Sequence, residues 1–193
     1  MTTTMEYHNP VLLQASVDGL NIKPDGIYVD VTFGGGGHSK EILSRLGTKG
    51  KLFAFDQDED ALANALQDER FVLINENFRH IKRFLRFYGV KSVDGILADL
   101  GVSSHQFDVA ERGFSTRFEA ELDMRMNQKG DISAYHVVNE YDEQDIARVL
   151  FDYGELKNAR AMANVIVTAR KDKEIRNSDE LKKVLAKFLP GHK

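Results

Sequence analysis

Cysteine is absent from this chain of 193 residues, and its absence excludes several kinds of chemistry. Without thiols there is no disulfide, no thiolate nucleophile and no zinc site built on cysteine. Long hydrophobic runs are absent too, because no stretch reaches the length needed to span a bilayer. Residues 1–8 hold neither the basic nor the apolar segment of a secretory signal. We therefore expect a cytoplasmic protein that has no membrane partner and needs no metal.

An excess of positive charge is also lacking, since 26 Lys and Arg residues face 30 Asp and Glu residues and give a net charge of −4. This balance argues against a uniformly basic nucleic-acid binder. It leaves room for a local basic patch, because contacts to phosphate depend on clustering rather than on the sum. Hydrophobic residues make up 42% of the chain, as in a globular protein of one domain with a small insertion.

The most informative segment is a run of four glycines, Gly34 to Gly37, between an apolar strand and a helical pattern that begins with His38. Glycine adopts positive φ and lets a ligand approach the backbone. The first N–H groups of a helix have no partner inside it, so this arrangement predicts a nucleotide-like cradle. The run is neither G-x-G-x-x-G nor a P-loop with Lys-Ser/Thr. A tight turn that binds nothing is the alternative.

The first hundred residues alternate between strand and helix patterns. Strands are predicted over 26–32, 52–55, 71–74 and 93–97, and helices over 37–46, 58–66 and 81–87. Apolar strands separated by helices indicate an α/β protein with a parallel sheet covered on both faces. Right-handed crossovers bring the carboxyl ends of all strands to one edge, where ligands of such sheets bind. That edge is expected to carry the glycines, His38, Asp56, Asn77, Phe78 and Asp99.

The strand pattern stops near residue 105. The segment 106–128 is irregular and rich in polar and aromatic residues. Helices are predicted over 133–138, 142–153, 158–171 and 178–188, with Asp142 and Ser178 as N-caps. We therefore expect a Rossmann-like cofactor-binding part over 1–104 and a mainly helical insertion or substrate subdomain over 105–193.

Asp56 narrows the choice of cofactor without settling it. It follows the glycines by about 20 residues at a strand end, where a carboxylate accepts hydrogen bonds from a ribose diol. NAD and S-adenosylmethionine (SAM) both carry that diol, and Asp56 could instead cap the next helix. Asp30 and the segment 99–104 favour SAM, which presents an ammonium and a sulfonium where NAD presents a pyrophosphate. A nicotinamide-dependent oxidoreductase and a non-catalytic SAM- or RNA-binding fragment stay open as alternatives.

Several short motifs follow one another in a specific order and at characteristic spacing. They are Asp30-Val31-Thr32-Phe33-Gly34, Gly36-Gly37-His38, Ala54-Phe55-Asp56-Gln57-Asp58, Asn77-Phe78, Asp99-Leu100-Gly101-Val102-Ser103-Ser104, Gln106, Glu111-Arg112-Gly113-Phe114-Ser115, Leu122-Asp123-Met124-Arg125-Met126 and Tyr153-Gly154-Glu155. From about residue 7 to its end the chain resembles the RsmH (MraW) family of bacterial 16S rRNA cytosine-N4 methyltransferases.

The resemblance implies a class I SAM-dependent methyltransferase fold and methyl transfer to N4 of a cytidine in the decoding region of 16S rRNA, on free rRNA or on the small ribosomal subunit. SAM, which leaves as S-adenosylhomocysteine, is then expected to contact Gly36, Gly37, His38, Asp56, Phe78, Asp99 and Gln106. Asp56 would bind the ribose diol and Phe78 would lie against adenine. For Phe78 the alternative is core packing.

Residues for the chemistry and for the target nucleotide are also implied. Asp99, Ser103 and Asp123 are candidate catalytic acceptors near the N4 hydrogens, and Ser104, Phe114 and Arg125 are candidates for binding the substrate. Each has an ordinary alternative: serines that satisfy a loop backbone, a phenylalanine in a core, and a mutual ion pair of Asp123 with Arg125.

The chain departs from the family pattern at His105, Phe107 and Leu156, where proline, leucine and glutamate are frequent. It is also shorter than family members, which continue with further strands. We therefore expect an N-terminal fragment whose parallel sheet is incomplete. Its fourth strand would then be an exposed hydrophobic edge, which favours self-association.

Overall fold

The computed structural model describes residues 10–189, so segment 1–8, which lacks a secretory signal pattern, lies outside the described residues. The chain divides into two compact units between Ser103 and Ser104. The sheet unit runs up to Ser103 and includes Met126–Gln128. The helical unit comprises Ser104–Arg125 and the chain from Lys129 onward.

The sheet unit contains four parallel strands, as the apolar runs predict. They are β1 (Ile27–Asp30), β2 (Lys51–Phe55), β3 (Phe71–Ile74) and β4 (Gly95–Leu97), in the order β3-β2-β1-β4. In register, Asp30 of β1 lies between Ala54 of β2 and Leu97 of β4. The chain crosses to the other side of β1 to form β4, so the strand order reverses between β1 and β4. Such a switch point is where open α/β sheets bind ligands.

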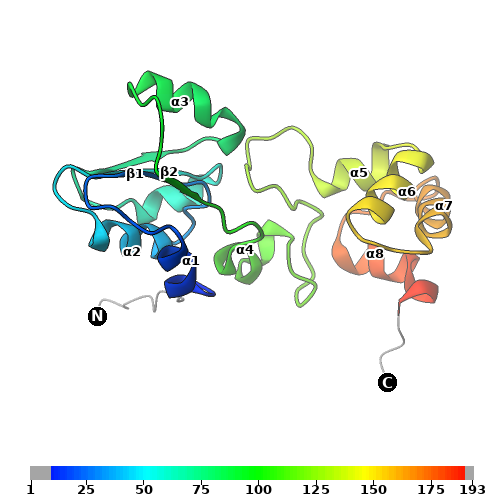
Figure 1. Cartoon of the computed structure of the whole chain (residues 1–193). Helices are drawn as coiled ribbons and strands as arrows, with labels where there is room; N and C mark the ends of the chain where they lie inside the picture. The colour runs from blue at the N-terminus through cyan, green and yellow to red at the C-terminus, as the bar shows by residue number, and fades with distance from the viewer. Residues whose placement is uncertain (1–9, 190–193) are drawn as a thin grey trace, which may run out of the picture. The chain divides into compact units, whose positions relative to one another are not determined.

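Helices cover both faces of the sheet (Figure 1). Helices α1 (Leu13–Gly19) and α2 (Gly37–Arg45) lie on one face and α3 (Ile81–Phe87) on the other. Alternate residues of a strand point to opposite faces. Tyr28 accordingly packs with Ile42 of α2, whereas Val29 packs on the side of α3. Two apolar layers thus hold the sheet, and the loops at its carboxyl edge rest on a packed core.

The predicted helix over 58–66 is instead a short 3-10 helix, η1 (Glu59–Asn64). Asp58 caps it by accepting a hydrogen bond from the Asp60 N–H, and Ala61 is its buried residue. With so little apolar surface to bury, tertiary packing does not sustain a full α-helix here. The structure also contains α1, which the sequence patterns did not predict.

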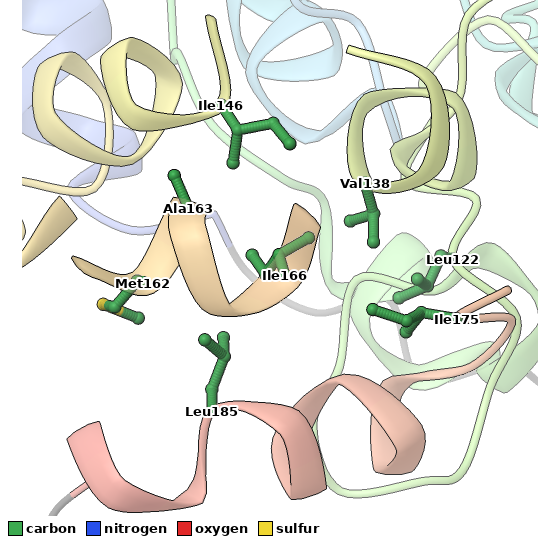
Figure 2. Close-up of a cluster of buried hydrophobic side chains, with 8 residues drawn as sticks. All are labelled: Leu122, Val138, Ile146, Met162, Ala163, Ile166, Ile175 and Leu185. Carbon is green, nitrogen blue, oxygen red and sulfur yellow. The ribbon is translucent and has the colours of Figure 1, made fainter. Parts of the chain in front are cut away.

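The helical unit is built around one apolar cluster. Its elements are α4 (Ser104–Asp108), η3 (Ala110–Arg112), α5 (Ala134–Glu140), α6 (Glu143–Asp152), α7 (Ala159–Ala169), α8 (Ser178–Val184) and η4 (Ala186–Phe188). Figure 2 shows Val138 of α5, Ile146 of α6 and Leu185, the residue that follows α8, gathered around α7. Helix α7 contributes Met162, Ala163 and Ile166 to this cluster. The four helices predicted after residue 130 are confirmed. The bounds of the first three differ from the predicted ones by one or two residues, and the last helix ends at Val184 rather than at residue 188.

The two predicted N-caps differ in outcome. Asp142 caps α6 by accepting from the Asp145 N–H at 2.8 Å, as predicted. The prediction for Ser178 was wrong, because Asn177 caps α8 by accepting from the Glu180 N–H. The Ser178 hydroxyl donates instead to the Phe118 carbonyl, so it links α8 to the preceding irregular segment.

The β4 strand forms one of the two edges of the described sheet, and its Ile96 is 52% exposed. Between residues 10 and 189 no helix combines the length and the apolar character needed to cross a membrane.

Candidate functional site

The loop from β1 to α2 has a backbone that favours glycine at two points. Gly34 has φ +49° and Gly36, the N-cap of α2, has φ +76°, both in the left-handed region. A Cβ on Gly36 would lie 2.9 Å from the Phe33 ring, whereas a Cβ on Gly34 would meet nothing within 4 Å. The backbone is therefore open to a ligand at Gly34. At Gly36 the clash with Phe33 is a second reason for glycine. At Gly37 packing is the reason, because a Cβ there would lie 2.4 Å from Pro10.

Asp56, at the end of β2, holds this loop in place. Its Oδ2 accepts from the Gly34 N–H at 2.7 Å, and its Oδ1 accepts from the Asp58 N–H at 2.9 Å. Asn64 donates to the Gly34 carbonyl at 3.1 Å, so both peptide groups of Gly34 are fixed. Asp58, and not Asp56, caps η1. Burial is the main reason that the pKa of Asp56 is raised. Each carboxylate oxygen keeps acceptor capacity for a further donor.

Asp30 lies beneath the loop, fully buried. Its Oδ2 accepts from the Ser39 hydroxyl at 2.8 Å, and its Oδ1 accepts from the Thr32 N–H at 3.0 Å. Burial raises the pKa of this carboxyl. Asp30 therefore connects the end of β1 to the first turn of α2. The sequence suggests that Asp30 faces the cofactor, but its contacts favour a structural role.

His38 and Asp99 face each other across the switch point. The buried His38 ring has its Nδ1 4.0 Å from Asp99 Oδ2, and the Asp99 side chain is 59% exposed. The Asp99 N–H donates to Thr32 Oγ1 at 2.8 Å, which ties the end of β4 to the end of β1. His38 Nε2 is buried and has no hydrogen-bond partner among residues 10–189. Leaving a buried nitrogen without a hydrogen bond costs about 1–3 kcal/mol, and a polar group of a ligand could offset that cost.

Phe78 follows β3 at the same edge. It is the first residue of η2 (Phe78–His80), and its side chain is 41% exposed. Phe78 is therefore not packed in the core, which is the alternative to a contact with adenine. Asn77 caps η2 and donates from its side chain to Gln57 Oε1 at 2.8 Å. The loops after β2 and β3 are thereby joined. The parallel sheet brings the glycine loop, His38, Asp56, Phe78 and Asp99 to its carboxyl edge, as the sequence predicts.

Ser103 belongs to the sheet unit, whereas the remaining candidates belong to the helical unit. Gln106 is buried in α4, and Ser104 is the exposed first residue of that helix. Phe114 is half-buried, with the Arg112 guanidinium 5.9 Å from its ring centre.

Asp123 and Arg125 form an ion pair, which is the alternative to roles of these residues in catalysis and substrate binding. Arg125 donates to both Asp123 oxygens, with a shortest distance of 2.5 Å, and its Nη1 donates to the Gly130 carbonyl at 2.8 Å. The guanidinium lowers the pKa of Asp123. The pair borders a pocket of about 330 Å³ that is also lined by Glu121, Leu122, Ser133, Tyr135, Glu174 and Arg176.

Three polar residues that organise the site were missed by sequence reasoning, namely Thr32, Ser39 and Asn64. Thr32 connects Asp30 to the Asp99 backbone, Ser39 binds Asp30, and Asn64 binds Gly34. All three are uncharged and common in loops. Only the position of Thr32, between a strand-end acid and the glycines, offered a signal.

Comparison with known proteins gives a consistent picture. Curated proteins named ribosomal RNA small subunit methyltransferase H are similar to this chain. The one from Flavobacterium johnsoniae is 79% identical over 190 residues, which is 98% of this chain and 63% of that protein. The Flavobacterium psychrophilum protein is 70% identical over 182 residues, 94% of this chain and 62% of its own length. The Christiangramia forsetii protein is 65% identical over 189 residues, which is 98% of this chain and 63% of that protein.

The chain thus spans a little under two thirds of the length of these relatives. The model of the MraW methylase family matches residues 5–193. With its α/β architecture of the class I methyltransferase type, this chain belongs to the MraW methylase family.

Proposed function

We propose that this chain carries the SAM site of a methyltransferase that modifies small-subunit rRNA at N4 of a cytidine in the decoding region. One observation supports it above the others: a glycine loop, an acid after β2 and an acid after β4 meet at the switch point of a parallel sheet. The similar proteins named as small-subunit rRNA methyltransferases support the RNA substrate. The cytoplasm, where ribosomes are made, is the location that we propose.

The donors and acceptors at the edge fit the groups of SAM. Asp56 is a partly exposed acceptor for the two hydroxyls of the ribose. Gly34 leaves its face of the loop open, and the exposed Phe78 ring offers a surface for adenine. The unpartnered His38 Nε2 and the exposed Asp99 carboxylate are polar groups without a full set of partners in the sheet unit. SAM, when bound, supplies an electrophilic methyl group on a sulfonium.

The chain's own contribution to catalysis is positional. The exocyclic amine of cytosine is a weak nucleophile because its lone pair is delocalised into the ring. Holding two reactants in line contributes about 7–11 kcal/mol in favourable cases. Asp99 is the acceptor that we favour for the N4 hydrogens, with Ser103 near it in sequence, since Asp123 is already paired with Arg125. The target base has to leave its stack, which costs a few kcal/mol.

The decisive experiment is calorimetric titration of the 193-residue chain with SAM, S-adenosylhomocysteine and NAD. We expect the first two to bind in the micromolar range and NAD not to bind. Binding of NAD alone would favour the oxidoreductase and contradict the proposal. Methylation is then measured with labelled SAM on small-subunit rRNA and on small ribosomal subunits, with the modified nucleoside identified by mass spectrometry. SAM binding without methylation would favour the non-catalytic fragment.

A further inference from the structure

Helix α3 and its flanking residues form a dense basic segment in an acidic protein. Between residues 79 and 91 there is no Asp or Glu, and the cations are Arg79, Lys82, Arg83, Arg86 and Lys91. The net charge of the whole chain is −4, so this local excess is opposite in sign to the total. A polyanion is attracted by such a patch rather than by net charge.

The packing of α3 turns this charge outward. Ile81, Phe84 and Leu85 pack against the sheet core, and the Phe84 ring lies 6.1 Å from that of Phe55. Lys82, Arg83 and Arg86 are exposed. Residues three and four apart are neighbours on a helix, so Arg79, Lys82, Arg83 and Arg86 share one outer face. Figure 1 shows α3 on the outside of the sheet, on the face opposite α2.

The cations on α3 itself lack acidic partners. Elsewhere Arg45, Arg70 and Arg125 each bind a carboxylate within 3 Å. No carboxylate lies within ion-pair distance of Lys82, Arg83 or Arg86 anywhere in the described part of the chain. Like charges at helical spacing destabilise a helix. A bound polyanion would offset that cost.

An exposed aromatic ring completes the surface. Phe87, at the end of α3, is 81% exposed, and its ring packs edge-on against Tyr88 at 5.2 Å. Proteins that bind single-stranded nucleic acid combine a basic surface with aromatic rings on which bases stack. An anionic membrane is less suited to this helix, because its apolar face is already buried on the sheet.

We propose that Arg79, Lys82, Arg83, Arg86 and Phe87, the α3 surface, bind a single-stranded segment of the substrate RNA. The cations contact phosphates and Phe87 stacks on a base. The α3 surface begins directly after Phe78, so it continues from the carboxyl edge of the sheet. The identity of the RNA as rRNA rests on the proposed function, whereas the binding surface rests on α3 itself.

The test uses the full chain and the triple variant Lys82→Gln, Arg83→Gln, Arg86→Gln. Binding to a labelled, mixed-sequence single-stranded RNA and to a small-subunit rRNA transcript is measured by fluorescence anisotropy between about 50 and 200 mM salt. We expect the slope of log K against log salt to become shallower by about 2, and affinity to fall about tenfold or more. The matched control, Lys49→Gln, Lys51→Gln, Lys171→Gln, removes the same charge from exposed positions outside α3 and should leave the slope unchanged.

The stacking part is tested with Phe87→Ala, and Phe151→Ala serves as an exposed aromatic control on α6. We expect Phe87→Ala alone to weaken RNA binding about fivefold or more with the salt slope unchanged. Circular dichroism melting confirms that every variant is folded.

Equal losses in the triple variant and its control would overturn the inference, as would a wild-type chain that binds no RNA. Binding to phosphatidylserine vesicles in place of RNA would assign the α3 surface to a membrane and overturn it too. A parallel titration with SAM separates the two proposals. A wild-type chain that binds RNA through α3 but does not bind SAM would contradict the proposed function and retain this inference.

Discussion

At the scale of single residues, the site depends on two carboxylates that end neighbouring strands and differ in what surrounds them. Asp30 is enclosed, with both oxygens bound to Thr32 and Ser39. Asp56 is bound to backbone N–H groups on its inner side and is partly exposed on the other. Asp30 therefore stabilises the fold. Asp56 stabilises the loop and can also accept hydrogen bonds from a ligand.

Asp56→Asn is expected to weaken SAM binding by about tenfold or more, because it replaces one acceptor oxygen by a donor at a charge-assisted hydrogen bond. Calorimetry measures the affinity. The exposed Asp25→Asn, placed before β1, is the control and should bind like the wild type. Unchanged affinity in the Asp56 variant would remove Asp56 from the proposed ribose site.

Asp30→Asn is expected to change the pH dependence of stability. Burial raises the pKa of Asp30, so the folded chain holds its proton more tightly than the unfolded chain does. The wild-type free energy of unfolding should then fall as the pH rises from the unfolded pKa toward the folded pKa. Asparagine has no such proton, so the free energy of unfolding of the variant should rise relative to that of the wild type as the pH increases above about 4, the ordinary pKa of an unfolded Asp. Urea unfolding at several pH values measures this, and a constant difference would contradict it.

At the scale of elements, the sequence predicts best where an apolar pattern is long or is bounded by turns. The predicted bounds of β3 and α3 match the structure, since both combine a dense apolar run with a polar flank. The predicted helix over 58–66 fails because its apolar residues find almost no core to pack against, and Leu62 stays exposed. The edge that collects the strand ends could be predicted from parallel topology. The partners Ser39 and Asn64 could not, because contacts between loops depend on geometry that no periodicity encodes.

The loop before α2 makes a prediction at this scale. Gly36→Ala should lower the free energy of unfolding by about 2–4 kcal/mol, because it adds left-handed backbone strain to a clash with Phe33. Gly34→Ala carries the backbone strain alone and should cost about 1 kcal/mol. Urea denaturation gives both values. For SAM affinity the order of the two variants should reverse, because Gly34→Ala places a Cβ directly on the face open to the ligand. Equal losses of stability in the two variants would contradict the packing argument.

At the scale of the whole molecule, the division into a sheet unit and a helical unit implies two cores. The one around α7 contains residues of the helical unit alone, and those around the strands contain residues of the sheet unit alone. A cavity in one core should therefore act locally. We propose that the boundary near Ser103 separates cofactor binding from a substrate subdomain.

Ile166→Ala is expected to destabilise the helical unit by about 2–5 kcal/mol, the usual cost of emptying a packed core site. Hydrogen exchange should report lost protection in α5 to α8 and retained protection in β1 to β3. Thr168→Ala, on the exposed side of α7, should stay within about 0.5 kcal/mol of the wild type. Loss of protection in both units at once would show that they unfold together.

The open edge at β4 leads to a prediction about assembly. We expect the chain to self-associate at high concentration through this edge, since unpaired strand edges with apolar side chains template further pairing. Ile96→Lys should restore a monomer. Val11→Lys, at another exposed apolar residue outside β4, should not. Light scattering measures the mass, and a wild-type monomer at high concentration would count against the prediction.

The strand order also has a consequence for synthesis. Every sheet-unit residue proposed to contact SAM lies between Gly34 and Asp99, and β1, β2 and β3 are made in the order in which they neighbour one another. At the usual pace of translation, that stretch of chain emerges over on the order of ten seconds. Only β4 has to return to the far side of β1, so the first three strands can assemble on the ribosome before the helical unit exists. We propose that SAM can then act as a folding ligand for the nascent chain.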